Sequence, residues 1–264
     1  MTTYVGDVLR SLIPYFSEND LGTVGSVTDN GDGTYDVVDA ALLEAQDDDH
    51  WNTAKVLWLN GDCEWAVHTV SDFTGATSTL VITGSTVPSA GDEFLVFKSV
   101  FSVGKFLQAI NSVLMGTRMM LEDETVSIVD EQVEYTLPSG VSDVRAVELV
   151  DSDGEYMGVH EQWSEYDGTL RFDANLPDTS WADTLRIHYA GTHPVVDEIG
   201  DAVQTIHQER LMWEAAEELM VKRAQDGHIN EKSDMFYALV VKKATKARRE
   251  HPLRLMNKQR AMSW

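Results

Sequence analysis

Apolar residues recur at the spacing of an amphipathic helix near the start of the chain and again near its middle. One face of the first predicted helix carries Val5, Val8, Leu9, Leu12 and Phe16. Pro14 weakens the end of this helix, because proline lacks a backbone N–H donor. Between Val100 and Glu122, the apolar face carries Phe106, Ile110, Val113, Leu114, Thr117 and Leu121. The pattern therefore predicts two helices in this half of the chain, each with one face for packing.

The last quarter of the chain shows the same helical spacing. From Asp201 to Gln225 the apolar stripe consists of Ile206, Trp213 and Met220, with Ala216 and Leu219 beside it. Gly227 can close this helix, and Asn230 can cap the next one. That next helix places Met235, Phe236, Leu239 and Val240 on one side before cations replace the apolar pattern. We therefore expect two consecutive helices here, the second of which ends in a basic segment.

Two other stretches have the short alternating segments and turn residues of β structure. Between Gly22 and Lys98 these segments are TVGSVT, TYDVVD, NTAKVLWL, EWAVHTVSDF, STLVITG and EFLVFKS. Their spacing predicts a small barrel or sandwich. Between Thr125 and Gly191 the segments are VSIVD, VEYTLP, VRAVELVD, YMGVHEQW, TLRFD and TLRIHYAG.

The order helix, β, helix, β, helix, helix predicts an α+β fold. The simplest packing joins the helices into a bundle core from which two β-rich insertions emerge. We expect residues 1–21, 99–122 and 201–250 to form this helical core. Residues 22–98 and 123–200 would then be the two β-rich regions, and residues 251–264 a basic C-terminal arm.

The end of the chain reverses the charge of the rest. Residues 222–264 contain 11 Lys and Arg against 4 Asp and Glu, a net charge of +7 in a chain of net charge −24. Residues 1–221 contain 9 cations and 40 anions, a net charge of −31. A reversal this sharp indicates that the basic end meets a different partner from the acidic body. The alternative is a solvated basic terminus, but Leu255 and Trp264 are not typical of one.

Composition excludes several classes of protein. The chain has no run of 18 apolar residues and no charged-then-apolar leader, so we expect neither a membrane span nor a secretory signal. Cys63 is the only cysteine, which excludes an internal disulfide and a cysteine-based zinc cluster and favours a cytoplasmic origin. The acidic body should repel nucleic acid.

Candidate chemical sites are weak in this sequence. It contains no GxSxG elbow, phosphate-binding glycine loop, dinucleotide fingerprint or HExxH helix, so we expect no enzyme and no cofactor. The run from Asp47 to His50 could coordinate a cation, but hydrated carboxylates on a loop are the simpler interpretation. His207 and Glu214 are two turns apart on one helix, where a solvated face is the simpler interpretation. We therefore predict no metal site.

The second β region and the helix after it contain a characteristic order of segments: VEYTLPSGVSDVRAVELVD, a Trp-containing strand, TLRFDANLPD, TLRIHYAGTHPVVD and GDAVQTIHQERLMWEAAEELM. This order resembles the C-terminal half of the head-to-tail adaptor, or connector, proteins of tailed bacteriophages. In that family, a pair of strands around LRF and LRIxYxG leads through a proline and an acidic loop into a long helix. The first β region, with DFTGATSTLVITG and AGDEFLVF, is similar to insertions in phage neck proteins.

The resemblance implies a structural virion protein at the head-to-tail interface, present in the host cytoplasm during assembly. Adaptors of this family form a ring, usually a dodecamer, beneath the portal protein and above a tail tube, nozzle or terminator protein. DNA passes through the ring without specific binding, and an acidic wall suits this role because it lowers phosphate affinity. The alternatives are another tail-completion, neck or baseplate component and, less favoured, a carbohydrate-binding module or a hydrolase with paired carboxylates.

Within that role, the basic end of the chain is the expected portal-docking arm. A basic segment studded with apolar residues can dock into a groove on an acidic neighbouring ring, guided by charge attraction. The predicted contact residues are Lys242, Lys243, Lys246, Arg248, Arg249, Arg254, Leu255, Lys258, Arg260 and Trp264.

Overall fold

The computed structural model describes residues 3–40, 46–159, 163–172, 182–203, 206–225 and 231–253. Among the described residues, strands account for 39% and helices for 28%. The chain divides into two compact units. The first unit comprises Met1–Val113, Val196–Val203 and His207–Ala247, and the second comprises Leu114–Val195, Gln204–Ile206 and Arg248–Trp264. Of the helices in the described residues, none combines the length and apolarity needed to cross a membrane.

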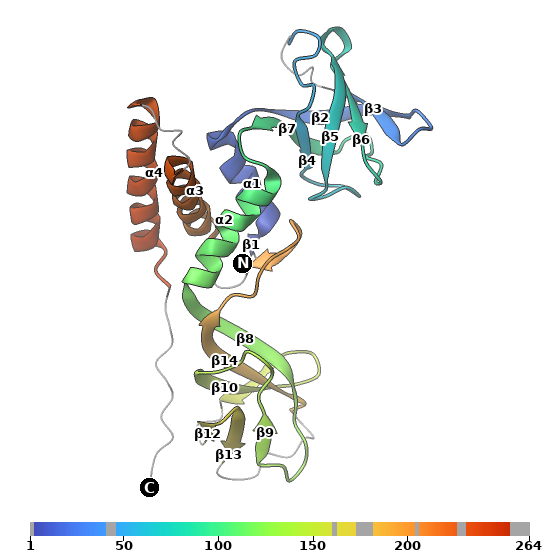
Figure 1. The fold of residues 1–264 in the computed structure, drawn as a ribbon. Coiled ribbons are helices and arrows are strands. Elements are labelled where there is room, and N and C mark those ends of the chain that lie inside the picture. Colours follow the sequence, from blue (N-terminus) through green and yellow to red (C-terminus); the bar gives the residue numbers. More distant parts are fainter. Residues whose placement is uncertain are drawn as a thin grey trace. The chain divides into compact units, whose positions relative to one another are not determined.

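The first unit contains a closed barrel of six antiparallel strands (Figure 1). Its strands are β2 (Ser17–Asp29), β3 (Thr34–Asp39), β4 (Lys55–Trp58), β5 (Val67–Thr74), β6 (Thr79–Thr83) and β7 (Glu93–Ser99). Their order around the barrel is β2, β3, β6, β5, β4, β7, and β2 closes the barrel by pairing with β7. In that pair Ser17 lies opposite Ser99, and the Ser99 hydroxyl donates to the carbonyl of Phe16 at 3.4 Å. The chain thus enters and leaves the barrel at one place.

Large side chains fill the barrel interior. The core includes Trp51, Val56, Trp58, Phe73, Leu80, Phe94 and Val96. Strand β3 shows why the barrel forms, since its residues alternate between buried and half-buried positions, as a strand with one face on a core does. The β2–β3 turn places Gly31 and Gly33 at φ angles of 78° and 86°, which suit glycine. This turn is therefore a glycine-rich hairpin.

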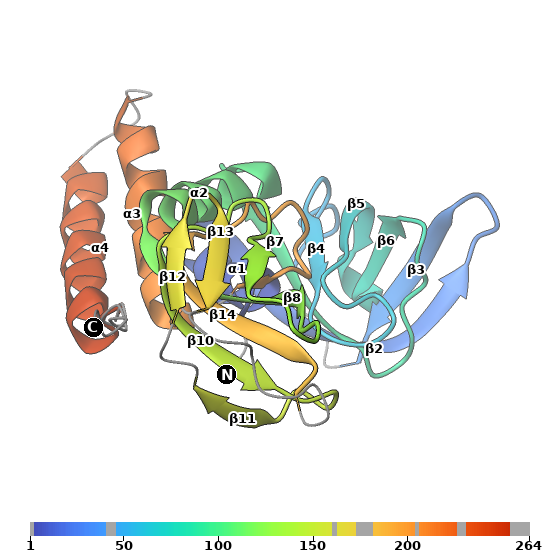
Figure 2. The ribbon, with the colours of Figure 1, turned by 90° about the horizontal axis from the view of Figure 1, so that it is seen from below.

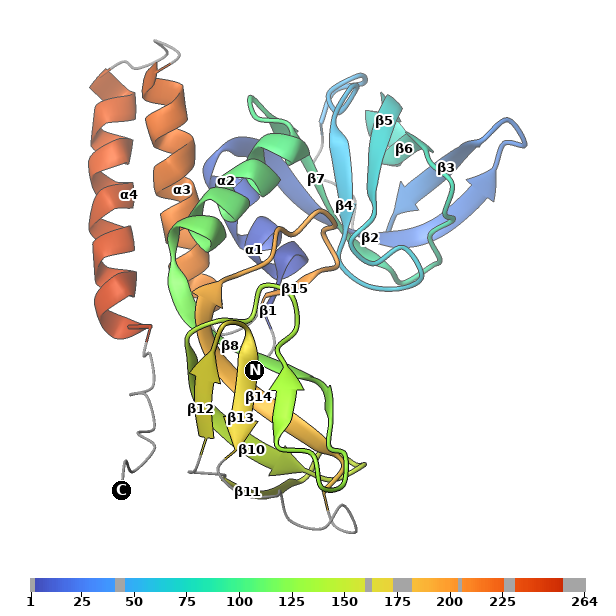
Figure 3. The same ribbon diagram turned by 60° about the horizontal axis from the view of Figure 1, so that its bottom comes forward.

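Strand β7 is buried on both of its faces. Phe94 and Val96 belong to the barrel core, whereas Leu95 and Phe97 are equally buried but alternate to the other face. Leu57 on the neighbouring strand β4 is also fully buried and lies outside the core cluster. Helices α1 (Val5–Leu12) and α2 (Val103–Gly116) lie beside β7 in Figure 3. The barrel therefore has an apolar outer row on this side.

Helices α1 and α2 pack through the faces that the sequence marks. Helix α1 contacts α3 (Gln208–Gln225) and continues into the 3₁₀ helix η1 (Ile13–Tyr15), which contains Pro14. The predicted apolar face of α1 is buried at every position. Phe16, Phe101, Phe106 and Phe236 form a cluster of edge-to-face ring contacts. Helix α4 (Glu231–Glu250) lies side by side with α3 (Figures 1 and 3), and β1 (Thr3–Tyr4) pairs with β15 (Ala202–Val203).

The second unit is built from two antiparallel sheets (Figure 2). The larger sheet has the order β11 (Tyr156–Val159), β10 (Val144–Val150), β14 (Thr184–Thr192), β8 (Arg118–Ser127). The smaller sheet has the order β12 (Trp163–Tyr166), β13 (Thr169–Phe172), β9 (Glu134–Thr136). Both sheets contribute to one core, in which Tyr135, Trp163 and Phe172 meet Val147, Leu185 and Ile187. The two sheets therefore pack face to face.

The predicted helical bundle core is wrong. The protein is mostly β, with four α-helices in the described residues, and its closed barrel has a core of its own. The physical reason is that the barrel fills itself with its own aromatic side chains and needs no helix to cover its interior. The finer domain boundaries given above stay predictions.

The helix predicted for residues 100–122 is too long. Helix α2 ends at Gly116, and strand β8 begins at Arg118. Met119 and Leu121 are buried while the residues beside them are not, which is the two-residue period of a strand. Leu121 fits both a helical and a strand period, so the apolar pattern alone extended the helix across this boundary.

Candidate functional site

Helix α4 carries the described part of the predicted docking segment. Its buried side is narrow and consists of Val240, Ala244 and Ala247. Phe236 adds an aromatic contact, with its ring centroid 5.6 Å from that of Phe16. These residues lie three or four positions apart, so they form one stripe along the helix. Most of the other side chains described on this helix are exposed.

The predicted docking residues fall into two groups. Lys242, Lys243 and Lys246 are exposed on α4, and Arg248 and Arg249 are exposed in its last turn. Helix α4 therefore brings these five cations together along its C-terminal half. The remaining predicted residues, Arg254, Leu255, Lys258, Arg260 and Trp264, lie outside the described residues.

The cations on α4 do not all have the same surroundings. The Nζ atom of Lys243 lies 5.7 Å from the centroid of the Trp213 ring on α3, the distance of a cation–π contact. Lys243 therefore leans toward α3. At about 100° per residue, Lys242 and Lys246 point to the side of α4 opposite Val240 and Ala244.

Two apolar residues of this helix were assigned wrongly from the sequence. Met235 and Leu239 were expected on the packing face, but they are 79% and 44% exposed. With Lys242 and Lys246 they fall within about 60° of one another around the helix axis. We call Met235, Leu239, Lys242 and Lys246 the outer stripe. The sequence shows the outer stripe through its spacing, because its members follow one another at intervals of four, three and four residues. The first two members are apolar and the last two are cations.

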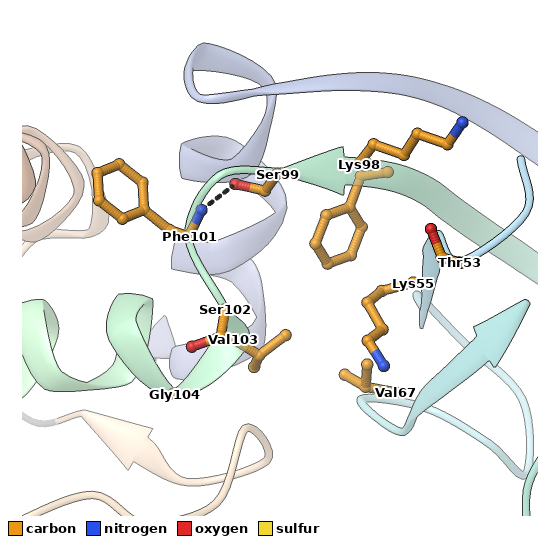
Figure 4. A pocket seen from close by; sticks show the side chains of 10 residues that line it. Thr53, Lys55, Val67, Lys98, Ser99, Phe101, Ser102, Val103 and Gly104 are labelled. Atoms are coloured by element: carbon orange, nitrogen blue, oxygen red, sulfur yellow. Dashed lines mark hydrogen bonds between the residues drawn. The ribbon is translucent and has the colours of Figure 1, made fainter. Parts of the chain in front are cut away.

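A pocket of about 500 Å³ lies where β4 and β7 of the barrel meet the start of α2 (Figure 4). Phe97, Phe101 and Val103 supply much of its apolar lining, and Lys55 and Lys98 its charge. Lys55 donates to the hydroxyl of Thr69 at 2.6 Å, and Lys98 donates to the carbonyl of His50. These contacts join strands and loops of the barrel, so both lysines have a structural role.

The candidate cation ligands near Asp48 are engaged in fixing their loop. Asp48 accepts a hydrogen bond from the backbone N–H of Gly75 at 2.8 Å. Asp49 accepts one from the side-chain amide of Asn52 at 2.7 Å. His50 lies 3.1 Å from a carboxylate oxygen of Glu18. The run from Asp47 to His50 thus anchors the loop before β4 to the neighbouring strands.

Helix α3 is not solvated where the sequence suggested it. Glu214 is buried, and its carboxylate accepts a hydrogen bond of 3.0 Å from Nε of Arg210, one turn earlier. Burial of a charge requires such a partner, because the carboxylate loses its hydration. His207, in contrast, is exposed, so His207 and Glu214 do not share one environment.

Cys63 has the surroundings of a structural thiol. It is buried in the barrel core, and burial raises the pKa of its thiol above the usual value. A reactive cysteine needs the opposite shift, because the thiolate is the nucleophile.

No protein-family model and no curated protein matches this sequence. Function is therefore inferred from the residues and their geometry.

His68 is a buried titratable group of the barrel. The indole N–H of Trp58 donates to Nδ1 of His68 at 3.2 Å, which leaves the proton on Nε2, 3.3 Å from the hydroxyl of Thr86. Burial lowers the pKa of His68 below its usual value. The folded barrel therefore holds neutral imidazole, because protonation of Nδ1 would replace an acceptor with a donor facing Trp58.

We expect the barrel to lose stability as the pH falls below about 6.5, where His68 of the unfolded chain takes up a proton. The stability that depends on neutral His68 is fully present above that pH. It decreases as the pH falls, until the pH reaches the lower pKa of His68 in the folded state. Urea unfolding at neutral and at mildly acidic pH measures this loss of stability, with amide exchange of the barrel strands as the probe. The variant His68→Asn keeps an acceptor for Trp58, so its stability should depend less on pH. An equal dependence in both proteins would contradict this role of His68.

Proposed function

We propose that this chain is a structural virion protein that forms a ring adaptor between the portal and the tail of a tailed phage. In this role the ring provides a conduit for DNA. The proposal extends the resemblance of the second β region and of the helix after it to head-to-tail adaptor proteins.

The observation that carries the proposal is the separation of charge along the chain. Residues 1–221 have a net charge of −31, whereas exposed cations gather on the C-terminal half of α4. An acidic surface repels the phosphate backbone, so DNA can pass along it without being held. A basic helix on the same chain supplies the opposite charge for contacts with neighbouring acidic subunits.

The construction of the two units supports a scaffolding role. The barrel and the two-sheet unit each have a packed core, with Trp58 and Phe94 fully buried in the first and Leu170 and Phe172 in the second. Closely packed cores resist deformation. Such units suit a protein that transmits contacts between larger assemblies.

The contacts of the proposed ring follow from the basic segment. The predicted portal-docking arm runs from Lys242 to Trp264, and its part from Arg254 to Trp264 lies outside the described residues. The opposite side of the ring would meet the tail tube, nozzle or terminator protein.

Electron microscopy of the purified full chain tests the proposal. We expect closed rings with an open axial channel, and we expect the same ring beneath the portal in particles that contain this protein. Tight retention of double-stranded DNA by the ring would contradict a passive conduit. A protein that stays monomeric at high concentration and is absent from the head-to-tail interface would overturn the proposal.

A further inference from the structure

The outer stripe of α4 combines apolar and positively charged side chains along one side of the helix. Met235 and Leu239 occupy the first half of the stripe, and Lys242 and Lys246 occupy the second. Val240 and Ala244, at the opposite side, are fully buried. The inward side of α4 is therefore buried, and the outer stripe is an exposed side.

We propose that the outer stripe docks on the acidic surface of a second copy of this chain. The inference rests on the proposed function, because it assigns the contact that joins neighbouring subunits of the ring. It divides the basic segment between two partners. The helical part meets the neighbouring copy, and the part beyond the described residues is left for the portal.

The apolar half of the stripe indicates a protein partner. Met235 exposes 79% of its surface and Leu239 exposes 44%, one turn apart on the same side. Exposed apolar residues at helical spacing are the anchors by which an amphipathic helix binds a protein groove. A nucleic-acid backbone would engage the lysines but would leave Met235 and Leu239 in water.

Charge complementarity indicates that the partner is this same chain. Its first 221 residues have a net charge of −31, and this excess of negative charge attracts Lys242 and Lys246. That surface also offers apolar contact next to carboxylates. On β2, for example, Leu21 is 59% exposed and lies directly after Asp20.

The same charges exclude a contact between two outer stripes. Two outer stripes placed face to face would bring lysines together, and like charges in contact are unfavourable. The stripe must therefore meet a different surface of the next copy. Repeated head to tail, such a contact generates a closed ring when its rotation closes and an open filament when it does not. A ring adaptor needs this type of contact.

Charge reversal on the stripe, Lys242→Glu with Lys246→Glu, tests the inference in the full chain. The matched control is Arg10→Glu with Lys105→Glu, because both residues are exposed on other helices and the net charge changes equally. We expect the stripe variant to weaken self-association at least about tenfold and the control to leave it unchanged, as measured by analytical ultracentrifugation and electron microscopy. Circular dichroism should show both variants folded, since all four side chains are exposed.

A second variant, Met235→Ser with Leu239→Ser, tests the apolar half without a change of charge. We expect it to weaken self-association as well, and a photo-crosslinker in place of Leu239 should link to acidic segments before residue 222 of another copy.

If the charge-reversed and serine variants form the same rings as the unchanged protein, the docking inference is overturned while the ring adaptor stands. If the unchanged protein forms no ring, both fail. If charge reversal abolishes only DNA or portal attachment, the second copy is the wrong partner.

Discussion

Trp58→Ala is expected to destabilise the barrel by about 4 kcal/mol, the typical cost of truncating a buried tryptophan. Trp58 is fully buried, its ring centroid lies 5.5 Å from that of Phe94, and its N–H donates to His68. The substitution leaves a large cavity in the core and removes the donor that faces Nδ1 of His68. Amide exchange of the barrel strands during urea unfolding measures the effect within the barrel itself.

The control variant Trp58→Phe separates the cavity from the hydrogen bond. It keeps most of the aromatic packing and loses the donor to His68, so we expect a loss of only about 1 to 2 kcal/mol. The strands of the second unit should keep their exchange rates in both variants, because its core is separate from that of the barrel. Equal losses for alanine and phenylalanine would show that packing around Trp58 contributes little.

Arg210→Met is expected to cost about 3 kcal/mol, because it removes a cation that donates a hydrogen bond of 3.0 Å to the buried carboxylate of Glu214. The two side chains are 12% and 7% exposed, and their contact of 3.0 Å lies within α3, the helix that contacts α1. Chemical denaturation monitored by circular dichroism measures the change in the free energy of unfolding.

The double variant Arg210→Met with Glu214→Leu completes this test. Replacing both partners removes the buried charges together, and apolar replacements of a buried ion pair are often neutral or stabilising. We therefore expect the double variant to recover most of the stability that Arg210→Met loses. Additive losses from the two substitutions would contradict the pairing of these residues as the source of the effect.

Local patterns in the sequence predicted the elements better than their arrangement. The apolar face of α1 and the glycine turn between β2 and β3 depend on residues within a few positions of each other, so the sequence shows them directly. Closure of the barrel depends on β2 pairing with β7, which joins Ser17 to Ser99 across 82 positions. No local period reports a contact at that separation. The bundle was inferred from the helices alone, and it was wrong for this reason.

The outer stripe shows a different limit of sequence reading. Met235 and Leu239 have the spacing of a packing face, and so do Val240, Ala244 and Ala247 on the other side of α4. The apolar pattern marks both sides, and large residues lie on each, because Phe236 is on the packing side. Only the packed structure distinguishes the intramolecular face from the exposed one.

The pairing of Ser17 with Ser99 also affects how the protein meets mechanical force. Tension between α1 and α2 reaches the hydrogen bonds at this junction before it reaches the rest of the barrel. Strands β2 and β7 are antiparallel neighbours at this junction. Pulling their adjacent ends apart would therefore break the hydrogen bonds between them one after another. The junction is therefore the point at which the barrel would begin to yield, and β3, β5 and β6 would keep their pairing longest.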